Sequence, residues 1–360
     1  RMVLEKYPEN SMQQEFRFFL GEALFYQEKY DEAAVEYQQF LQDYPLSRFR
    51  EKVCLHLGQA HYFQKNYAAA AEHFSQIDST HKLYWEAQYL IGISLLEEGK
   101  LAEAQPYFQR VMDSGEKALR GKSLLAQGRA FFQKNEYRKA IEFLHPLTEE
   151  TDLLPSAVNE ALFLQALAAY NLNEFETAAQ TFQELLLAGP DAELIPKIHY
   201  FAAECYYQLK KYDEAKDFYQ KNRDLYPESA WAAPSIEALA RTELEQQNWA
   251  EAASHFQLLQ SNYPQTEQGQ NAIYFLGLVA HKQDDLEAAK TYLQKYIDDY
   301  PENEFMLQAC YELAKIYYDQ KNWEQAIHYF DLIAEKFPTS DFTQEAMFFS
   351  GEALYYNGKP

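Results

Sequence analysis

The sequence has little glycine, proline and cysteine, and it has no long apolar run. Its 360 residues include 12 Gly and 13 Pro, and this scarcity of turn-forming residues disfavours an all-β fold. The three cysteines, Cys54, Cys205 and Cys310, lie far apart and outside any C-x-x-C spacing, which indicates neither a disulfide framework nor a zinc site. No stretch approaches the roughly 20 consecutive apolar residues that cross a bilayer. We therefore expect a folded, soluble chain without direct membrane insertion.

Basic residues are also scarce. Lys and Arg number 32 against 55 Asp and Glu, which gives a net charge of −23. A polyanion of this size repels nucleic-acid phosphates, so the composition argues against a nucleic-acid partner. Apolar residues make up 47% of the chain, which is enough for a substantial core, and aromatic residues alone make up 16%.

The chain repeats itself with a period of about 37 residues. The segment FLGEALFY at 19–26 returns as FSGEALYY at 349–356, and self-similarity at a fixed interval is typical of repeat proteins. One small residue marks the same place in each repeat, at intervals of 34 to 38 residues and mostly of 37. These register residues are Gly21, Gly58, Gly92, Gly128, Ala166, Ala203, Ala240, Gly277, Ala314 and Gly351.

A second small residue follows twelve positions after nearly every register residue, and an aromatic residue or Leu precedes it by three positions. Two helices approach closely only where side chains are small, so this pattern predicts tightly packed helical hairpins. The second small residues are Ala33, Ala70, Ala104, Ala140, Ala178, Ala215, Ala252, Ala289 and Ala326. The residues three positions before them are Tyr30, Tyr67, Leu101, Tyr137, Phe175, Tyr212, Trp249, Leu286 and Trp323.

Several repeats close with Tyr-Pro or Phe-Pro, as at 44–45 and 337–338. Proline ends the second helix, and a polar residue two positions later is expected to cap the next helix. The expected caps are Ser47, Ser229, Thr266, Asn303 and Ser340. We predict nine complete helix pairs over residues 14–343.

Partial repeats are expected at both ends of the chain. A second helix of an earlier repeat is expected to end at Tyr7-Pro8. The final repeat contributes only its first helix, which is expected to end near residue 357. Each repeat buries its apolar faces only against its neighbours, so we expect apolar surface to be exposed around Val3, Leu4 and Phe348. End-to-end self-association would follow from that exposure.

Three turns depart from the pattern. The repeat between Gly58 and Gly92 is three residues short, and the turns at 78–81, 113–116 and 148–156 lack the Tyr-Pro closure. These turns lie at one edge, where they are either a contact site or drifted linkers. Pro146 falls late in a second helix and is expected to kink it.

The small residues, the aromatic residue before Ala33 and the proline at the repeat end form the pattern of tetratricopeptide repeats. The chain resembles this family over essentially its whole length. The resemblance implies an all-α fold, a right-handed superhelical solenoid of helix-turn-helix repeats, here as one solenoid over residues 1–360. The repeats are longer than the usual length of about 34 residues. With the closing Tyr-Pro-x-Ser and the opening Tyr-Phe-Leu-Gly at 274–277, they resemble a bacterial cell-envelope branch of the family.

That branch includes Tol–Pal-associated proteins and the tetratricopeptide lipoprotein of the outer-membrane β-barrel assembly machine. Its members are periplasmic scaffolds, tethers and secretion-system accessories. The resemblance implies a periplasmic or cell-envelope location, with a cytoplasmic location as the alternative.

In tetratricopeptide solenoids the first helices line a concave groove, which directs attention to one face of those helices. Positions three before and four after each register residue are seven residues apart, about two helical turns, and so share that face. Fourteen of these twenty residues are aromatic, where the chain average would give about three. The candidate partner-binding residues are Phe18, Phe25, Tyr62, Tyr89, Phe132, Phe163, Tyr170, Tyr200, Tyr207, Tyr274, Tyr311, Tyr318, Phe348 and Tyr355.

Two interpretations of these rings remain open. The rings pack against one another and stabilise the stack, or they form a ladder that grips an extended peptide or a helix, since Tyr offers contact area and a hydroxyl at low entropic cost. Glu237, Leu244 and His281 interrupt the stripe, which suggests a groove divided into two halves. The flanking positions carry eleven acidic and seven basic residues. Most negative charge is therefore expected on second helices and loops, where it favours solubility and long-range attraction of basic partners.

The sequence contains no convincing site for catalysis, a metal or a cofactor. Gly121-Lys122-Ser123 resembles part of a phosphate-binding loop, but Gly115 lies one residue too far away. The nine histidines are scattered and do not form H-E-x-x-H. Cys54 and Cys310 occupy the same repeat position, which indicates packing residues rather than nucleophiles.

We therefore predict a non-catalytic scaffold that binds a partner protein or peptide in an aromatic groove, within a bacterial envelope or secretion complex. The first alternative is a structural spacer or self-assembling rod. The second is a substrate-recruiting region of a longer enzyme.

Overall fold

The computed structural model describes residues 12–149 and 154–358. In these residues the chain forms nineteen helices and no strand, which confirms the all-α prediction. It divides into two compact units, residues 1–190 and 191–360. The helices of the first unit are α2 (Gln13–Tyr26), α3 (Tyr30–Asp43), α4 (Arg50–Phe63), α5 (Tyr67–Ser75), α6 (Tyr84–Glu97), α7 (Leu101–Asp113), α8 (Lys117–Gln133), α9 (Tyr137–Glu149), α10 (Pro155–Asn171) and α11 (Phe175–Ala188). Those of the second are α12 (Ile195–Gln208), α13 (Tyr212–Leu225), α14 (Ala232–Glu245), α15 (Trp249–Asn262), α16 (Glu267–Lys282), α17 (Leu286–Asp299), α18 (Met306–Asp319), α19 (Trp323–Lys336) and α20 (Asp341–Tyr356).

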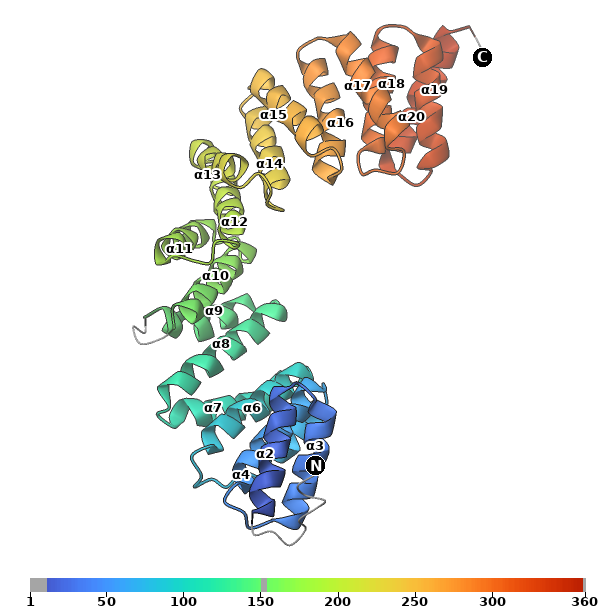
Figure 1. Ribbon diagram of the computed structural model, residues 1–360. Coiled ribbons are helices and arrows are strands. Elements are labelled where there is room, and N and C mark those ends of the chain that lie inside the picture. The colour runs from blue at the N-terminus through green and yellow to red at the C-terminus, as the bar shows by residue number, and fades with distance from the viewer. Residues whose placement is uncertain (1–11, 150–153, 359–360) are drawn as a thin grey trace. The chain divides into compact units, whose positions relative to one another are not determined.

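Consecutive helices pack as hairpins within each unit, as Figure 1 shows. The first helix of each hairpin carries the register residue, and the second helix begins at the bulky residue that the sequence pattern singled out. Nine such hairpins, from α2–α3 to α18–α19, are followed by α20, which is again a first helix. The expected helix tail ending at Tyr7-Pro8, with Val3 and Leu4, lies outside the described residues.

The register residue makes room for a large side chain of the second helix. A Cβ atom placed on Gly58 would lie 2.5 Å from the Phe74 ring, and one on Gly21 would lie 2.5 Å from the Tyr37 ring. Both rings are buried, at 1% and 0% exposure. The second small residues, such as Ala33, are fully buried as well. The predicted close approach of two helices at small residues is therefore confirmed.

Each hairpin turn contains one residue in the left-handed conformation, seven positions after the register residue. Lys65 shows the pattern with a φ of 61°. Its N–H donates to the Tyr62 carbonyl at 2.9 Å, and the Asn66 N–H donates to the His61 carbonyl at 2.8 Å. These two bonds are the Schellman arrangement that ends a helix. Among the ten equivalent positions only Gly99 and Gly358 are glycine.

Two of the five predicted caps are correct and three are wrong. Thr266 and Ser340 accept a hydrogen bond from the first turn of α16 and α20. At Ser47, Ser229 and Asn303 a single turn comes before the helix instead: in the first case the Arg50 N–H donates to the Ser47 carbonyl at 3.0 Å. The N-cap position then falls to an aromatic residue, respectively Phe49, Trp231 and Phe305.

The departures from the repeat have local causes. The repeat after Gly58 is short because its second helix, α5, has 9 residues where α3 has 14, and a longer turn after α5 makes up part of the difference. Pro146 lies inside α9, which continues to Glu149, and Pro106 lies inside α7. Part of the turn at 148–156 lies outside the described residues.

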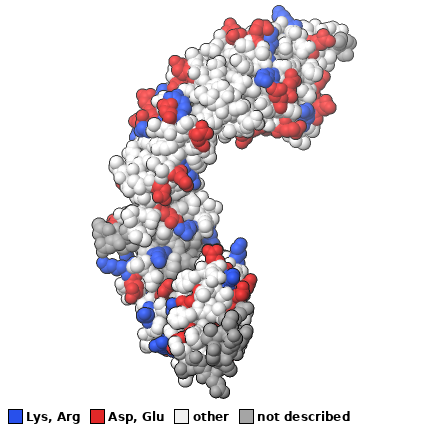
Figure 2. Space-filling view, in the orientation of Figure 1, with Lys and Arg blue, Asp and Glu red and all other residues white. Residues whose placement is uncertain are grey.

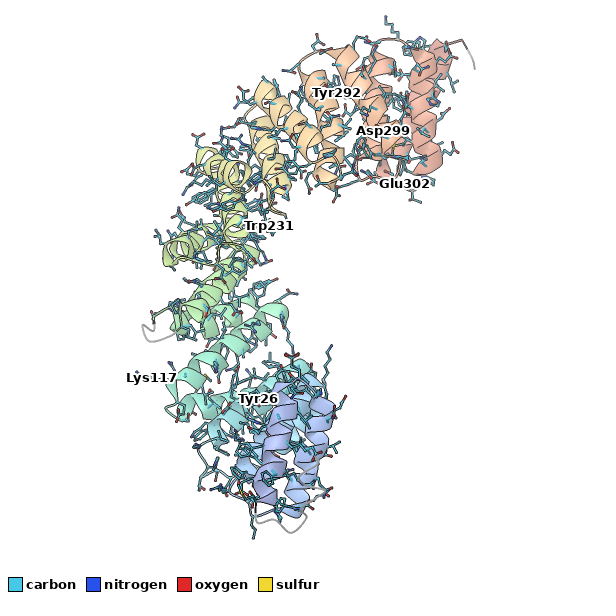
Figure 3. All side chains as sticks on the ribbon, viewed as in Figure 1. Tyr26, Lys117, Trp231, Tyr292, Asp299 and Glu302 are labelled. Atoms are coloured by element: carbon cyan, nitrogen blue, oxygen red, sulfur yellow. The ribbon has the colours of Figure 1, made fainter. Side chains whose placement is uncertain are left out.

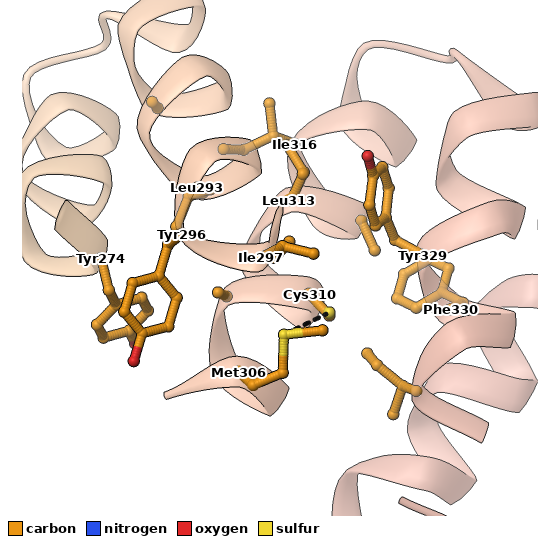
Figure 4. Close-up of a cluster of buried hydrophobic side chains, with 14 of the residues drawn as sticks. Tyr274, Leu293, Tyr296, Ile297, Met306, Cys310, Leu313, Ile316, Tyr329 and Phe330 are labelled. Carbon is orange, nitrogen blue, oxygen red and sulfur yellow. Dashed lines mark hydrogen bonds between the residues drawn. The ribbon is translucent and has the colours of Figure 1, made fainter. Parts of the chain in front are cut away.

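The hairpins bury several apolar clusters within each unit. Figure 4 shows part of the core of the second unit, where side chains of α16, α17, α18 and α19 meet. Cys310 lies there, fully buried, beside Met306. Within the described residues, no helix combines the length and the apolar character that crossing a membrane requires. Phe348, on α20, is 66% exposed, in line with the apolar surface expected around it.

Candidate protein-binding face

The first helices form a closely spaced face in each unit. Successive first helices contact one another, α6 with α8 and α8 with α10 in the first unit and α12 with α14 and α14 with α16 in the second. Second helices of successive hairpins make no contact of that extent in the described part of the chain. We call the surface of the first helices the inner face. It carries the twenty positions that the sequence analysis selected.

Rings three positions before the register residue close the seam between neighbouring hairpins. Phe18 stacks on Phe49 with ring centroids 4.3 Å apart and planes at 8°. Tyr274 stacks on Phe305 at 4.9 Å and 5°. In each pair the second ring belongs to the N-cap position of the next first helix. Phe18 and Tyr274 are consequently 3% and 6% exposed, which withdraws most of both rings from the surface.

The same seam recurs wherever the seam ring and the residue nine positions before the next register residue are both aromatic. Tyr200 lies 5.0 Å from Trp231, which Figure 3 labels near the start of α14, and Tyr311 lies 5.2 Å from Phe342. Tyr89, in the first unit, contacts Phe108 of its own hairpin at 6.1 Å. For this set the packing interpretation of the rings therefore fits most of the contacts.

Rings four positions after the register residue lie differently. Six of the seven make an edge or tilted contact with the first residue of their own second helix, as Tyr62 does with Tyr67 at 5.3 Å. These six residues are half-buried, and the seventh, Tyr355 on α20, is 75% exposed. We call this set the ladder rings. They are Phe25, Tyr62, Phe132, Tyr170, Tyr207, Tyr318 and Tyr355.

Carboxylates of the next hairpin hold several tyrosine hydroxyls on the inner face. The Tyr62 hydroxyl donates to Glu97 at 3.3 Å, and the Tyr311 hydroxyl donates to Glu345 at 2.6 Å. Burial, followed by the charge of Glu97, raises the pKa of Tyr62 to about 12. These hydroxyls remain protonated donors at neutral pH, and the rings stay in fixed positions before any partner arrives.

The remaining candidates occupy the expected positions on first helices. Phe163 lies on α10, half-buried, and contacts Phe182 of α11 at 6.4 Å. Phe348 lies on α20 next to Phe349, with centroids 5.6 Å apart. All fourteen candidate residues therefore lie on first helices of the described structure.

The inner face is interrupted in the second unit, as the sequence indicated. Glu237 takes the place of a seam ring on α14, and Leu244 takes the place of a ladder ring. His281 follows on α16, where its Nδ1 lies 3.4 Å from a carboxylate oxygen of Glu312. Burial raises the pKa of Glu237, Arg241 opposes that effect, and Glu267, Glu304 and Glu204 add to it.

Sequence reasoning missed a buried polar network in the first hairpin. Glu22 accepts hydrogen bonds from Tyr37 at 2.7 Å and from Lys52 at 2.7 Å, and its other contact is His56 Nδ1 at 2.6 Å. A signal was present, because Glu204 and Tyr219 occupy the same two repeat positions and also form a hydrogen bond. Burial tends to raise the pKa of Glu22, but the bonds from His56, Lys52 and Tyr37 outweigh it and lower the pKa to about 2.

The described surface has hollows in both units. A cleft of about 630 Å³ lies at the edge of the second unit, between the start of α12 and the turn before α14, and Leu225, Pro227 and Trp231 line it. A hollow of about 280 Å³ lies on the inner face between α6 and α8, with Glu97 and Arg129 at its wall. The side chain of Arg129 is paired with Glu160.

No group of three or more metal-ligating side chains occurs among the described residues. Cys54, Cys205 and Cys310 are fully buried. Burial raises the pKa of Cys54 to about 11 and those of Cys205 and Cys310 to about 12. Thiols in this state are poor nucleophiles, as the packing interpretation of Cys54 and Cys310 requires.

Charge is distributed over both units. Figure 2 shows acidic side chains over the visible face of each unit, with fewer Lys and Arg among them. Several of the basic side chains are engaged within the chain. Lys315 Nζ lies 4.0 Å from the centroid of the Phe349 ring, and Lys52 lies 5.1 Å from that of Phe18. Rings of the inner face therefore already accept cations.

Comparison with known proteins agrees with the repeat pattern. A family model described as tetratricopeptide repeat matches residues 18–87, 55–118 and 89–145, and another of the same description matches residues 194–265. A model described as outer membrane lipoprotein matches residues 234–349. A model described as anaphase-promoting complex, cyclosome, subunit 3 matches residues 153–222. A comparison with curated proteins found no match.

A search of solved structures found similar chains at low sequence identity, one of them with a TM-score above 0.5. The C-terminal part of a TPR repeat-containing protein from Cytophaga hutchinsonii is 16% identical with a TM-score of 0.51, and the match covers 81% of this chain and 98% of that chain. A tetratricopeptide repeat protein from Parabacteroides merdae is 17% identical with a TM-score of 0.47, over 74% and 98% of the two chains. The two tetratricopeptide models together match more than half of the chain, and its hairpins repeat with the spacing and close packing of that motif. The chain belongs to the tetratricopeptide-repeat family.

Proposed function

We propose that the chain is a non-catalytic scaffold that binds a segment of a partner protein along the inner face, and that the ladder rings are its main contacts. The family fold is typical of protein–protein interaction scaffolds. The observation that carries the proposal is the row of half-buried rings on the first helices. Phe18 and Tyr274 are buried in the seam, whereas the ladder rings Tyr62 and Tyr207 stay half-buried and accessible.

The ladder rings are suited to recognition because they are already ordered. Edge or tilted contacts with the second helix hold six of the seven rings, and a carboxylate holds the hydroxyl of Tyr62. A partner that binds a pre-ordered surface loses less affinity to the ordering of side chains. Tyrosine offers both apolar area and a hydrogen-bonding group, and it is enriched among residues that dominate binding energy.

We further propose that this scaffold works in a bacterial cell envelope or secretion complex. The match of residues 234–349 to a model of an outer membrane lipoprotein supports this location. The matched residues run from α14 into α20 and so include most of the helices of the second unit. A fractionation of cells that express the full-length gene product tests the location directly, and recovery in the cytosol would contradict it.

The binding proposal is tested by variants of the ladder rings. Tyr207→Ala and Tyr318→Ala together remove two rings from the inner face of the second unit, while Tyr292→Ala on α17 removes a half-buried ring from a second helix as the control. Quantitative capture of envelope proteins is measured for the three versions of the chain, with circular dichroism to show that each is folded. We expect capture of at least one protein to fall about tenfold in the double variant and to persist in the control.

Capture that is equal in all three versions would overturn the proposal. It would favour the alternative of a structural spacer or rod, in which the inner face is unoccupied. A catalytic domain in the full-length gene product would place the chain in the role of a recruiting region and would leave the binding test unchanged.

A further inference from the structure

A side-chain hydrogen bond ties the turn before α4, and also the turn before α18, to the preceding first helix. Gln14 of α2 donates to the hydroxyl of Ser47, before α4. Asn303, before α18, donates at 3.0 Å to the side chain of Gln270 of α16. In both cases the glutamine lies seven positions before a register residue, and its partner follows 33 positions later. The repeat therefore contains a fixed place for this bond.

The turn before α14 faces a proline in place of the glutamine. Ser229 stands at the position of Ser47, and the residue 33 positions before it is Pro196. A proline side chain offers no group for a hydrogen bond. The Oγ atom of Ser229 is buried and has no hydrogen-bond partner within the described residues. Buried polar groups in native proteins are satisfied by protein, by water or by a ligand, so this hydroxyl is free to serve a bound molecule.

The replacement of glutamine by proline coincides with a cleft. Ser229 and Pro196 both line the cleft of about 630 Å³ between the start of α12 and the turn before α14, and Leu225, Pro227 and Trp231 form much of the remaining wall. This volume lies within the range of sites that bind ligands. None of the lining residues is one of the twenty inner-face positions. The cleft is thus a place apart from the ladder rings.

Several acceptors in the wall of the cleft are already engaged. The side chain of Asn222 donates to the Pro196 carbonyl at 2.8 Å. The hydroxyl of Tyr263 donates to the Pro227 carbonyl at 2.9 Å. Three more wall carbonyls accept N–H groups of the local turns, namely those of Tyr226, Ser229 and Trp231. A segment that docks here finds apolar surface and a hydroxyl, but few acceptors for its own N–H groups.

A proline-rich segment matches this supply of groups. Prolyl residues have no N–H, so a polyproline II segment lies against an apolar wall without burying unpaired donors. Its carbonyls remain acceptors, and rotation about χ1 lets the Ser229 hydroxyl donate to one of them. Segments of this kind dock in grooves lined by aromatic rings, and Trp231 supplies such a ring here.

The rim of the cleft adds a charge preference. Glu193 and Glu228 line the cleft and are exposed, and no lysine or arginine of the described chain lines it. A basic residue beside the prolines is favoured at this rim, and an acidic one is disfavoured. We propose that the cleft between the start of α12 and the turn before α14 binds a proline-rich segment of a partner protein that carries an adjacent lysine or arginine. This second docking site does not depend on the ladder rings.

Other occupants fit less well. A β-strand would bury N–H groups against Pro196, Leu225 and Pro227, where few acceptors remain. An α-helix uses its carbonyls internally, so its backbone leaves the Ser229 hydroxyl without an acceptor. An acidic segment would meet the carboxylates of Glu193 and Glu228.

The test uses the full chain and three labelled peptides of equal length. The first peptide has proline at two of every three positions and two arginines at one end. The second has alanine in place of every proline, and the third has glutamate in place of the arginines. Binding is measured by fluorescence anisotropy at low and at physiological salt. We expect the first peptide to bind, the second to bind at least tenfold more weakly, and the third to bind more weakly most of all at low salt.

Variants then locate the site. Pro196→Gln restores the residue that bonds in the other turns, and we expect its side chain to reach the Ser229 hydroxyl, to occupy part of the cleft and to weaken binding of the first peptide at least tenfold. Ser229→Ala removes a hydroxyl that has no partner in the free chain. We expect its melting temperature to stay equal to or above that of the parent, while binding weakens about fivefold.

Ser47→Ala is the matched control. It makes the same change at the equivalent turn of the first unit, where the hydroxyl already has a partner in Gln14. We expect this variant to melt at a lower temperature than the parent and to bind the first peptide with unchanged affinity. Circular dichroism of each variant shows whether it is folded.

Equal binding of the proline and alanine peptides would overturn the inference, and so would full binding by Pro196→Gln. Binding that is lost in the Tyr207→Ala, Tyr318→Ala double variant but kept in Pro196→Gln would place the peptide on the inner face, which overturns the inference and supports the proposed function. Binding that is lost in Pro196→Gln and kept in the double variant supports the second site, whatever the capture experiment shows for the ladder rings.

Discussion

The hydroxyl of Tyr37 donates a hydrogen bond of 2.7 Å to the buried carboxylate of Glu22, one helix away in the same hairpin. The carboxylate also joins this hairpin to the next, through Lys52 and His56 of α4. A single side chain therefore connects three helices of the first unit. Its removal leaves the buried Tyr37 hydroxyl with His56 Nδ1, at 3.4 Å, as its remaining side-chain partner.

We predict that Glu22→Gln destabilises the first unit and alters its response to acid. The pKa of Glu22 is lowered to about 2 from an ordinary value of 4.5. The ionised carboxylate thus stabilises the fold above about pH 4.5, and this contribution is lost as the pH falls from there toward 2. Its magnitude is on the order of 3 kcal/mol. Urea unfolding followed across this pH range should show a steeper loss of stability for the parent chain than for Glu22→Gln.

Glu142→Gln is the control for this experiment. Glu142 lies exposed on α9, and its substitution removes the same charge without touching a buried network. The free energy of unfolding of this variant should follow that of the parent at every pH. A Glu22→Gln variant with an unchanged acid response would show that the network contributes nothing to stability.

We predict that Gly58→Ala and Gly351→Ala have opposite effects although both replace a register residue. The new methyl group at position 58 would lie 2.5 Å from the fully packed Phe74 ring, and overpacking of this kind costs about 1–3 kcal/mol. At position 351 no described atom lies within 4 Å, so alanine should stabilise α20 by up to about 1 kcal/mol through helix propensity. Thermal unfolding of the two variants checks the signs. Destabilisation of both would show that register residues matter for a reason other than the facing ring.

We predict that glycine stabilises the hairpin turns that lack it. Lys65 has a φ of 61° and Lys210 a φ of 58°, a conformation that costs a residue with a side chain about 1 kcal/mol or more. Lys65→Gly and Lys210→Gly should each raise the free energy of unfolding by about 0.5–1 kcal/mol. Gln64, the neighbouring residue, has a φ of −75°, so Gln64→Gly should lower stability and is the matched control. Chemical denaturation distinguishes these signs, and destabilisation by all three variants would contradict the prediction.

We predict that the three cysteines react with a thiol reagent only when the chain unfolds. Burial raises the pKa of Cys54 to about 11 and the pKa values of Cys205 and Cys310 to about 12. The thiolate is the reactive form, so the native protein should react slowly at pH 8, whereas all three thiols should react rapidly in guanidinium chloride. Reaction of a thiol at its unfolded rate under native conditions would show that its hairpin is open.

The hairpins could be predicted from the sequence because their packing depends on residue size at fixed spacing. Gly58 and Ala70 are small for the reason that the pattern indicated, and the second helix begins at Tyr67, the bulky residue of that pattern. The left-handed residue of each turn could not be predicted, because Lys65 carries no glycine signal. The backbone adopts that conformation since the Schellman bonds outweigh its local cost.

The candidate site was predicted in position but not in detail. The sequence placed Phe18 and Phe25 on the same helix face, and they are there. The sequence pattern did not distinguish seam rings from ladder rings. The distinction depends on Phe49, an aromatic residue of the next repeat. Phe49 takes the N-cap position because an additional turn precedes α4. The wrong cap at Ser47 and the undivided set of rings thus have one cause.

The junctions between hairpins also bear on cooperativity. In a linear array each module is stabilised by its two neighbours, so thermal opening spreads along the array until it meets a weak junction. Phe256 of α15 stacks on Phe275 of α16 with ring centroids 4.9 Å apart, and Tyr274 stacks on Phe305 across the next junction. Opening that begins at α20 is therefore expected to pass both junctions, so that α14 to α19 would exchange their amide hydrogens as one cooperative unit.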